Sequence, residues 1–114
     1  MLFNDFIKNE AKNLYKTILL GLFTKENLEE INEIDYINTP EKEFLSYLTE
    51  DVDKEIVEGH FKQYLMHYEV SDITDHFNEY YGKDIKYEEE WEFIDGLYRK
   101  IRSRMFKKIK KDFK

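Results

Sequence analysis

Half of the positive charge of this 114-residue chain lies in its last sixteen residues. Residues 99–114 hold nine lysines and arginines and one acid, a net charge of +8, while residues 1–98 hold nine lysines and 24 acids, a net charge of −15. Such a cationic segment has the electrostatic character of a phosphate-binding arm. A simpler interpretation is that it neutralises the acidic body. As a nucleic-acid arm, it would use Arg99, Arg102, Arg104, Lys107 and Lys108.

The acidic residues are the more distinctive feature. Between Glu26 and Asp95 the sequence has 22 acids and only five lysines. Much of this charge must lie on the surface, because unpaired carboxylates are rarely buried. An acidic surface serves solubility, and it also attracts proteins with basic grooves, since carboxylates can stand where phosphates would. The candidate partner-binding residues form two stretches: Glu88, Glu89, Glu90 and Glu92 in one, and Glu50, Asp51, Asp53 and Glu55 in the other.

Three histidines are candidates for metal binding. His60 and His67 are seven residues apart on one helical face, and Asp72, His76 and Glu79 share a face of the next predicted helix. The sequence lacks the Glu-x-x-His and His-Glu-x-x-His motifs, and it contains no cysteine, no glycine-rich phosphate loop and no serine nucleophile motif. We therefore predict no metal, no cofactor and no catalytic residue, and we expect a protein that is not an enzyme. The role of the histidines stays open.

Apolar residues spaced by three and four predict an all-α protein. Such a stripe runs from Phe3 to Leu22, and Thr24 can cap a short helix after it. The only proline, Pro40, is placed to begin a third helix that ends near Thr49. The spacing then predicts helices over residues 52–68 and 71–81, and Gly82 is placed to stop the second of these.

The last segment has the most regular pattern. Tyr87, Trp91, Ile94, Tyr98, Ile101 and Met105 alternate by four and three, which predicts one amphipathic helix of about 25 residues with Trp91 in the core. Acids at its start and lysines at its end compensate the helix macrodipole. The alternative is an α+β fold with one small hairpin near residues 80–88, because Ile85 and Tyr87 alternate beside a Gly-Lys-Asp turn.

We therefore expect one acidic helical domain over residues 1–114, a compact bundle of about five to six helices with a long C-terminal amphipathic helix. Its basic end, residues 99–114, can fray. The core must use large side chains, because nine Phe, nine Tyr and one Trp accompany a single alanine. A secretory signal and an apolar run long enough to span a bilayer are absent, which predicts a cytoplasmic protein with no membrane association.

This charge pattern favours an acidic, non-enzymatic binding protein that docks on and inhibits a basic nucleic-acid-handling protein such as a nuclease. Nucleic-acid mimics of the anti-defence or immunity type work in this way. The alternative is a nucleic-acid-binding or regulatory protein that uses the basic C-terminal helix. A third interpretation is a self-associating structural adaptor, with a homodimer formed through the last helix.

Overall fold

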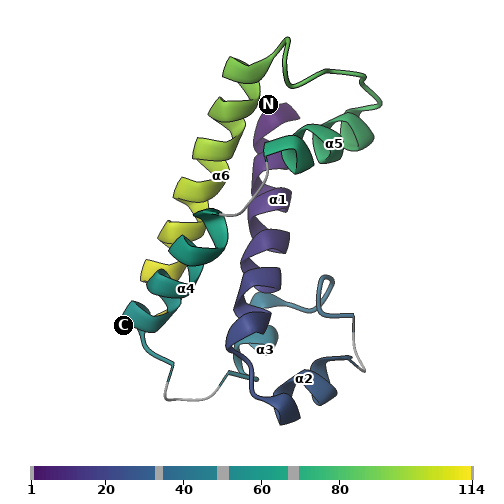
Figure 1. The fold of residues 1–114 in the computed structure, drawn as a ribbon. Coiled ribbons are helices and arrows are strands. Elements are labelled where there is room, and N and C mark those ends of the chain that lie inside the picture. Colours follow the sequence, from purple (N-terminus) through teal and green to yellow (C-terminus); the bar gives the residue numbers. More distant parts are fainter. Residues whose placement is uncertain (1, 33–34, 49–51, 67–69, 114) are drawn as a thin grey trace.

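The computed structural model describes residues 2–32, 35–48, 52–66 and 70–113. This part of the chain forms six α-helices and contains no strand (Figure 1). The all-α prediction is confirmed. The helices are α1 (Leu2–Leu19), α2 (Lys25–Asn32), α3 (Glu41–Leu45), α4 (Lys54–Met66), α5 (Val70–Tyr81) and α6 (Trp91–Asp112), and a 3-10 turn, Leu20–Leu22, follows α1. None of the described helices combines the length and apolarity that crossing a bilayer requires.

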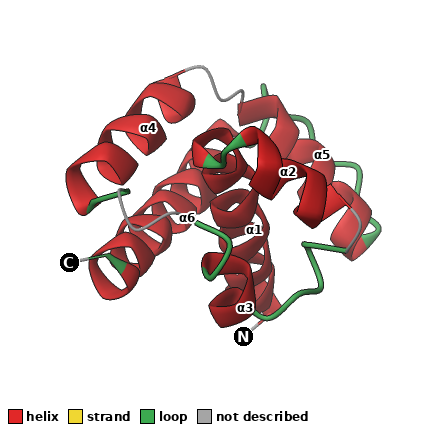
Figure 2. Cartoon of the chain, turned by 90° about the horizontal axis from the view of Figure 1, so that it is seen from below, coloured by secondary structure: helices red, strands yellow, loops and turns green. Residues whose placement is uncertain are grey.

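Helices α1 and α6 form the centre of the fold and run side by side in the same direction (Figure 1). Near their N-terminal ends, Phe77 of α5 packs against Phe6 of α1 and Phe93 of α6, with ring centroids 5.4 and 5.2 Å apart. At the opposite end, the Tyr15 hydroxyl donates to the Asp112 carboxylate over 3.0 Å. Seen along the pair, α4 and α3 lie on different sides of it (Figure 2). The parallel pair therefore leaves part of its surface uncovered.

The core is built from large side chains, as the composition predicts. The large aromatic side chains with at most 2% of their surface exposed include Phe6, Tyr15, Phe44 and Phe61. The expectation that Trp91 lies in this core is wrong, because 52% of its surface is exposed. Trp91 is the first residue of α6, and helical side chains lean towards the N-terminus, so no earlier turn of the helix lies beside its side chain.

Two predicted helix ends are confirmed by their hydrogen bonds. The Thr24 hydroxyl accepts from the Asn27 backbone N–H at 3.2 Å and so caps α2. At the end of α5, Gly82 has a positive φ of 62° and the Lys83 N–H donates to the Asn78 carbonyl at 3.0 Å. This is the pattern of a Schellman motif, in which glycine adopts the left-handed conformation at little cost.

The hairpin alternative near residues 80–88 is wrong. The side chain of Asn78 takes the place of a partner strand: its Oδ1 accepts from the Ile85 N–H at 2.9 Å, and its Nδ2 donates to the Ile85 carbonyl at 2.8 Å. A turn follows, in which the N–H groups of Glu89 and Glu90 donate to the Lys86 carbonyl. This turn explains why α6 begins at Trp91 and has 22 residues, a few fewer than predicted.

Helix α3 is also shorter than predicted. It covers Glu41–Leu45, and residues 46–48 continue in turns whose N–H groups donate to carbonyls three residues earlier. Such bonds tighten the end of a helix into 3-10 geometry. The predicted end at Thr49 lies outside the described residues.

A fully buried lysine fastens the segment before α3 to α1. The side chain of Lys16 has no exposed surface. Its Nζ donates to the carbonyl oxygens of Tyr36 at 2.9 Å and Ile37 at 3.0 Å, and also to that of Thr39. Burial lowers the pKa of Lys16, and the charge of nearby Lys12 lowers it further. Lys16 therefore satisfies three carbonyls of a segment without regular structure.

We predict that Lys16→Met destabilises the protein by about 2 kcal/mol, because methionine fills a similar volume but leaves these buried carbonyls without a donor. The measurement is the free energy of unfolding from urea denaturation. Lys12→Met, four residues away on the same helix and partly exposed, is the control and should change stability by less than about 0.5 kcal/mol. Equal losses in the two variants would contradict the role given to Lys16.

Candidate functional site

The surface of α6 is divided lengthwise into an apolar face and a cationic flank. Its buried residues are Ile94, Leu97, Ile101, Met105 and Ile109. Beside them, Lys100, Arg104, Lys107 and Lys111 follow at spacings of four, three and four and are all exposed. This spacing places the four cations on one face of a helix. We call them the cationic row.

The cationic row lines an open groove of about 620 Å³ between α6 and the N-terminal half of α1. Asn4 and Ile7 lie on the α1 side of this groove. The residues that line it, here called the cationic groove, are Asn4, Ile7, Arg99, Lys100, Ser103, Arg104, Lys107, Lys108 and Lys111. Six of these nine described residues are cations and none is an acid. The groove is therefore a concentrated source of positive potential on a chain whose net charge is −7.

Lys108 differs from the other cations of the groove in having a carboxylate partner. Its Nζ donates to Glu41 Oε1 at 2.6 Å and lies 5.6 Å from the centre of the Tyr15 ring. In the described part of the chain, no salt bridge joins the other five cations to an acid. Burial raises the pKa of the Tyr15 phenol most, and the nearby carboxylates of Asp112 and Glu41 raise it further. Lys108 thus belongs to the packing at the end of α1, and five cations keep their charge available to a ligand.

The structure brings together four of the five residues predicted for a nucleic-acid arm: Arg99, Arg104, Lys107 and Lys108 line one groove. The fifth, Arg102, lies outside its lining and is placed 5.8 Å from the centre of the Phe106 ring. Lys100 and Lys111 line the groove but were missing from the predicted set. Their spacing from Arg104 and Lys107 was the sequence signal that could have found them, because it marks one helical face.

The two predicted acidic stretches lie far apart, at the starts of different helices. Glu88, Glu89 and Glu90 form the turn before α6 and Glu92 lies in its first turn, whereas Asp53 and Glu55 lie at the start of α4, towards the other end of α6 (Figure 1). Asp53 also accepts from the Ile56 N–H at 2.9 Å and so caps α4. Glu50 and Asp51 lie outside the described residues. The two stretches therefore do not combine into one surface.

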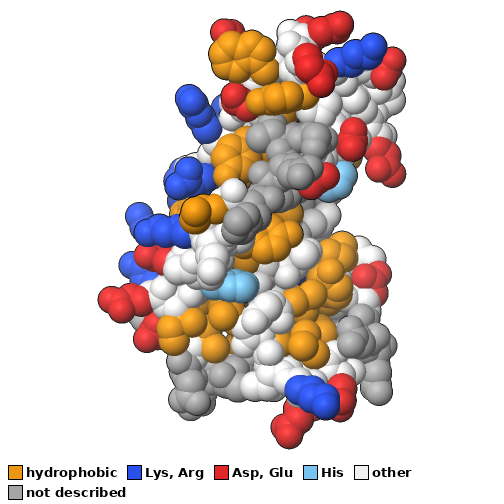
Figure 3. All heavy atoms as spheres, in the orientation of Figure 1, with side chains coloured by type: hydrophobic (Ala, Val, Ile, Leu, Met, Phe, Trp, Pro, Cys, Tyr) orange, Lys and Arg blue, Asp and Glu red, His pale blue; other side chains and the backbone are white. Residues whose placement is uncertain are grey.

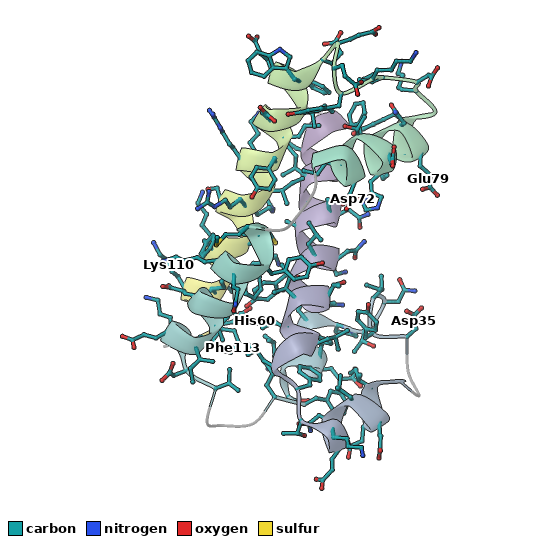
Figure 4. All side chains as sticks on the ribbon, in the orientation of Figure 1. Asp35, His60, Asp72, Glu79, Lys110 and Phe113 are labelled. Carbon is teal, nitrogen blue, oxygen red and sulfur yellow. The ribbon has the colours of Figure 1, made fainter. Side chains whose placement is uncertain are left out.

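Positive and negative side chains are distributed differently over the molecule. In the view of Figure 3, acids occur at the top, right, lower left and bottom, while lysines and arginines gather mainly along the left side, over α6. Lys110 projects there on the side of α6 away from α1 (Figure 4). Acids are thus shared among several elements, whereas eight of the described cations lie on α6 alone.

His60 has a structural role at the end of α1. Its Nε2 lies 2.8 Å from the Ile18 carbonyl oxygen, which the helix leaves without an internal partner. A Cβ atom on Gly21 would lie 2.6 Å from that same nitrogen. Glycine is therefore required at position 21 for the His60 ring to approach. His67, which was predicted to share the face of His60, lies outside the described residues.

His76 pairs with Glu10, a carboxylate on α1 that is 8% exposed. His76 Nδ1 and Glu10 Oε1 are 2.5 Å apart. Together with Asp72 and Glu79, which project from α5 (Figure 4), they line a second open groove of about 810 Å³. The described residues include no group of three or more acids and histidines arranged to hold a metal ion. At this groove, the His76–Glu10 pair joins α5 to α1.

The pairing with Glu10 helps to raise the pKa of His76. Burial lowers the pKa, but the hydrogen bond and charge of Glu10 and the charges of Asp72 and Glu79 raise it, so the net direction is upward from 6.5. A raised pKa in the folded state means that protonated His76 stabilises the fold. This contribution is complete below the unfolded pKa and is lost as the pH rises through the folded pKa.

We predict that His76→Gln removes a pH dependence of stability. As the pH rises from below 6.5, the wild type should lose a stabilisation of less than about 1 kcal/mol that the variant never has, since His76 is half exposed and its charge is screened. Urea denaturation at a series of pH values measures this difference. Glu10→Gln should abolish the same dependence. Parallel pH profiles of wild type and both variants would contradict the assignment.

Comparison with models of protein families, with curated proteins and with solved structures finds no match to this chain. The function must therefore be argued from the arrangement of charges and grooves.

Proposed function

We propose that this protein binds the phosphodiester backbone of nucleic acid in the cationic groove. The observation that supports this proposal is the convergence of six cations on one groove whose described lining includes no acid. A backbone of regularly spaced phosphates is the common biological polyanion that matches a row of cations. Lysines supply four of the six charges, and lysine acts as a mobile point charge suited to phosphate contact.

The acidic body directs this binding. With a net charge of −7, most of the surface repels a polyanion, so approach is favourable only with the cationic flank of α6 facing the nucleic acid. The separation of charge therefore orients the protein before contact. Neutralisation of the body is a weaker explanation of the same cations, since five of the six have no salt bridge to an acid in the described residues.

We predict that the triple substitution Lys100→Gln, Lys107→Gln and Lys111→Gln weakens binding to a labelled oligonucleotide by roughly tenfold or more, because three phosphate contacts and the counterions they release are lost. Fluorescence anisotropy at about 50 mM salt measures the affinity. The matched control is Lys42→Gln, Lys83→Gln and Lys86→Gln, which removes the same charge from three exposed lysines outside the groove.

The control should bind within about twofold to threefold of the wild type, since distant charges are largely screened. Equal weakening of both triple variants would show that only net charge matters, and the groove would lose its role. Absence of any binding by the wild type at low salt would reject the proposal outright.

In a second candidate function, acids near the start of α6 form a docking site for a basic protein partner, such as a nuclease that the chain would inhibit. One observation favours it: Trp91, with 52% of its surface exposed, is surrounded in sequence by the exposed acids Glu88, Glu89, Glu90 and Glu92. Tryptophan is the residue type most enriched in binding hot spots, and a rim of acids would orient a basic partner.

We predict that Trp91→Ala combined with Glu89→Gln and Glu90→Gln abolishes retention of such a partner. Affinity capture from the native host with wild-type protein as bait, followed by mass spectrometry, should recover a basic nuclease that the variant loses. The control bait, Asp72→Asn, Asp75→Asn and Glu79→Gln on α5, removes three exposed acids elsewhere and should retain the partner. Retention by all three baits would contradict the docking role of this surface.

A further inference from the structure

We infer that the cationic groove prefers double-stranded DNA to a single strand. The inference rests on the proposed function, because it concerns the kind of nucleic acid that the same groove takes. It is drawn from three properties of the groove: the packed helix that carries its cationic row, the length of that row, and the chemistry of the side chains around it.

The helix that carries the cationic row is packed into the core on its other face. Ile101, Met105 and Ile109 lie between or beside its members on the same helix and are 0–1% exposed. The segment from Lys100 to Lys111 is twelve residues of one uninterrupted helix. The helix fixes the spacing of the Cα atoms from which these mobile side chains extend. A duplex has its phosphates at fixed positions, whereas a flexible single strand would lose conformational freedom on following the row.

The length of the row fits a duplex. At 1.5 Å of rise per residue, the Cα atoms of Lys100 and Lys111 are about 16 Å apart. The major groove of B-DNA is about 12 Å wide, so a helix laid across it can place cations from its two ends near the phosphates on both edges. A duplex also presents about one charge per 1.7 Å of its axis, twice the density of either of its strands.

The groove lacks the side chains that hold single strands. Proteins that bind single strands combine a basic groove with aromatic side chains on which the bases stack. None of the described residues lining the cationic groove is aromatic. The exposed aromatic residues Tyr64, Tyr80 and Trp91 all lie outside that lining. A duplex, whose bases are already stacked on one another, needs no such platform.

The test compares one labelled DNA strand, alone and annealed to its complement, by fluorescence anisotropy at several salt concentrations. We expect the duplex to bind about tenfold or more tightly, with a slope of log K against log salt near −4 if about four phosphates are neutralised. The duplex preference should disappear in the Lys100→Gln, Lys107→Gln and Lys111→Gln variant and remain in the Lys42→Gln, Lys83→Gln and Lys86→Gln control.

The single variants Lys100→Gln and Lys111→Gln test whether both ends of the row make contact. Each should reduce the size of the salt slope by about one for the duplex. If only one of them does so, the cationic row does not reach the phosphates on both edges of the DNA major groove, and the length of the row no longer supports a preference for duplex. Equal or tighter binding of the single strand overturns the preference for duplex while leaving the proposed nucleic-acid function in place. If neither probe binds, the proposed function itself fails.

Discussion

The parallel packing of α1 against α6 is the constraint on which the rest of the structure depends. Parallel helices point their dipoles the same way, so the negative ends of both dipoles lie at one end of the molecule. Lys16 on α1 and Lys107, Lys108, Lys110 and Lys111 on α6 all occur near that end. Cations there offset a repulsion that an antiparallel pair would not have. Part of the basic character of the chain's end thus has a structural cause.

Packing and compensation of the helix dipoles explain some of the cations on α1 and α6, but not all of them. Lys16 is buried among three carbonyls, and Lys108 is paired with Glu41. Lys100 and Arg104 lie in the middle of α6, where a charge gains little from the helix terminus because the effect falls off within the last turn. The cationic row therefore extends further than the dipoles require. This excess, beside an α1 wall that contributes Asn4 and Ile7 and no acid, is the feature that supports the proposed polyanion site.

How far the sequence predicts this molecule depends on whether a feature is local. The helices, the Thr24 cap and the Gly82 stop follow from spacing and from backbone chemistry within a few residues, and they were predictable. The burial of Lys16 was not, because lysine is almost never buried and its three carbonyl partners are about twenty residues away. The exposure of Trp91 depended on where the preceding turn ends. The α1 wall of the groove required the pairing of α1 with α6, and no local pattern reports such a pairing.

Charge arrangement, more than charge sum, decides which surface of this protein can bind. The sum is negative and suggested an acidic docking surface, yet the acids are distributed over all six helices and the turn before α6, while seven exposed cations share α6. Spread charges of one sign give a weak and nearly uniform field, whereas aligned charges in a groove give a strong local one. The minority charge therefore creates the most concentrated feature of the surface. For the proposed function, an acidic body would add selectivity of orientation, since it would oppose approaches of a polyanion to surfaces other than α6.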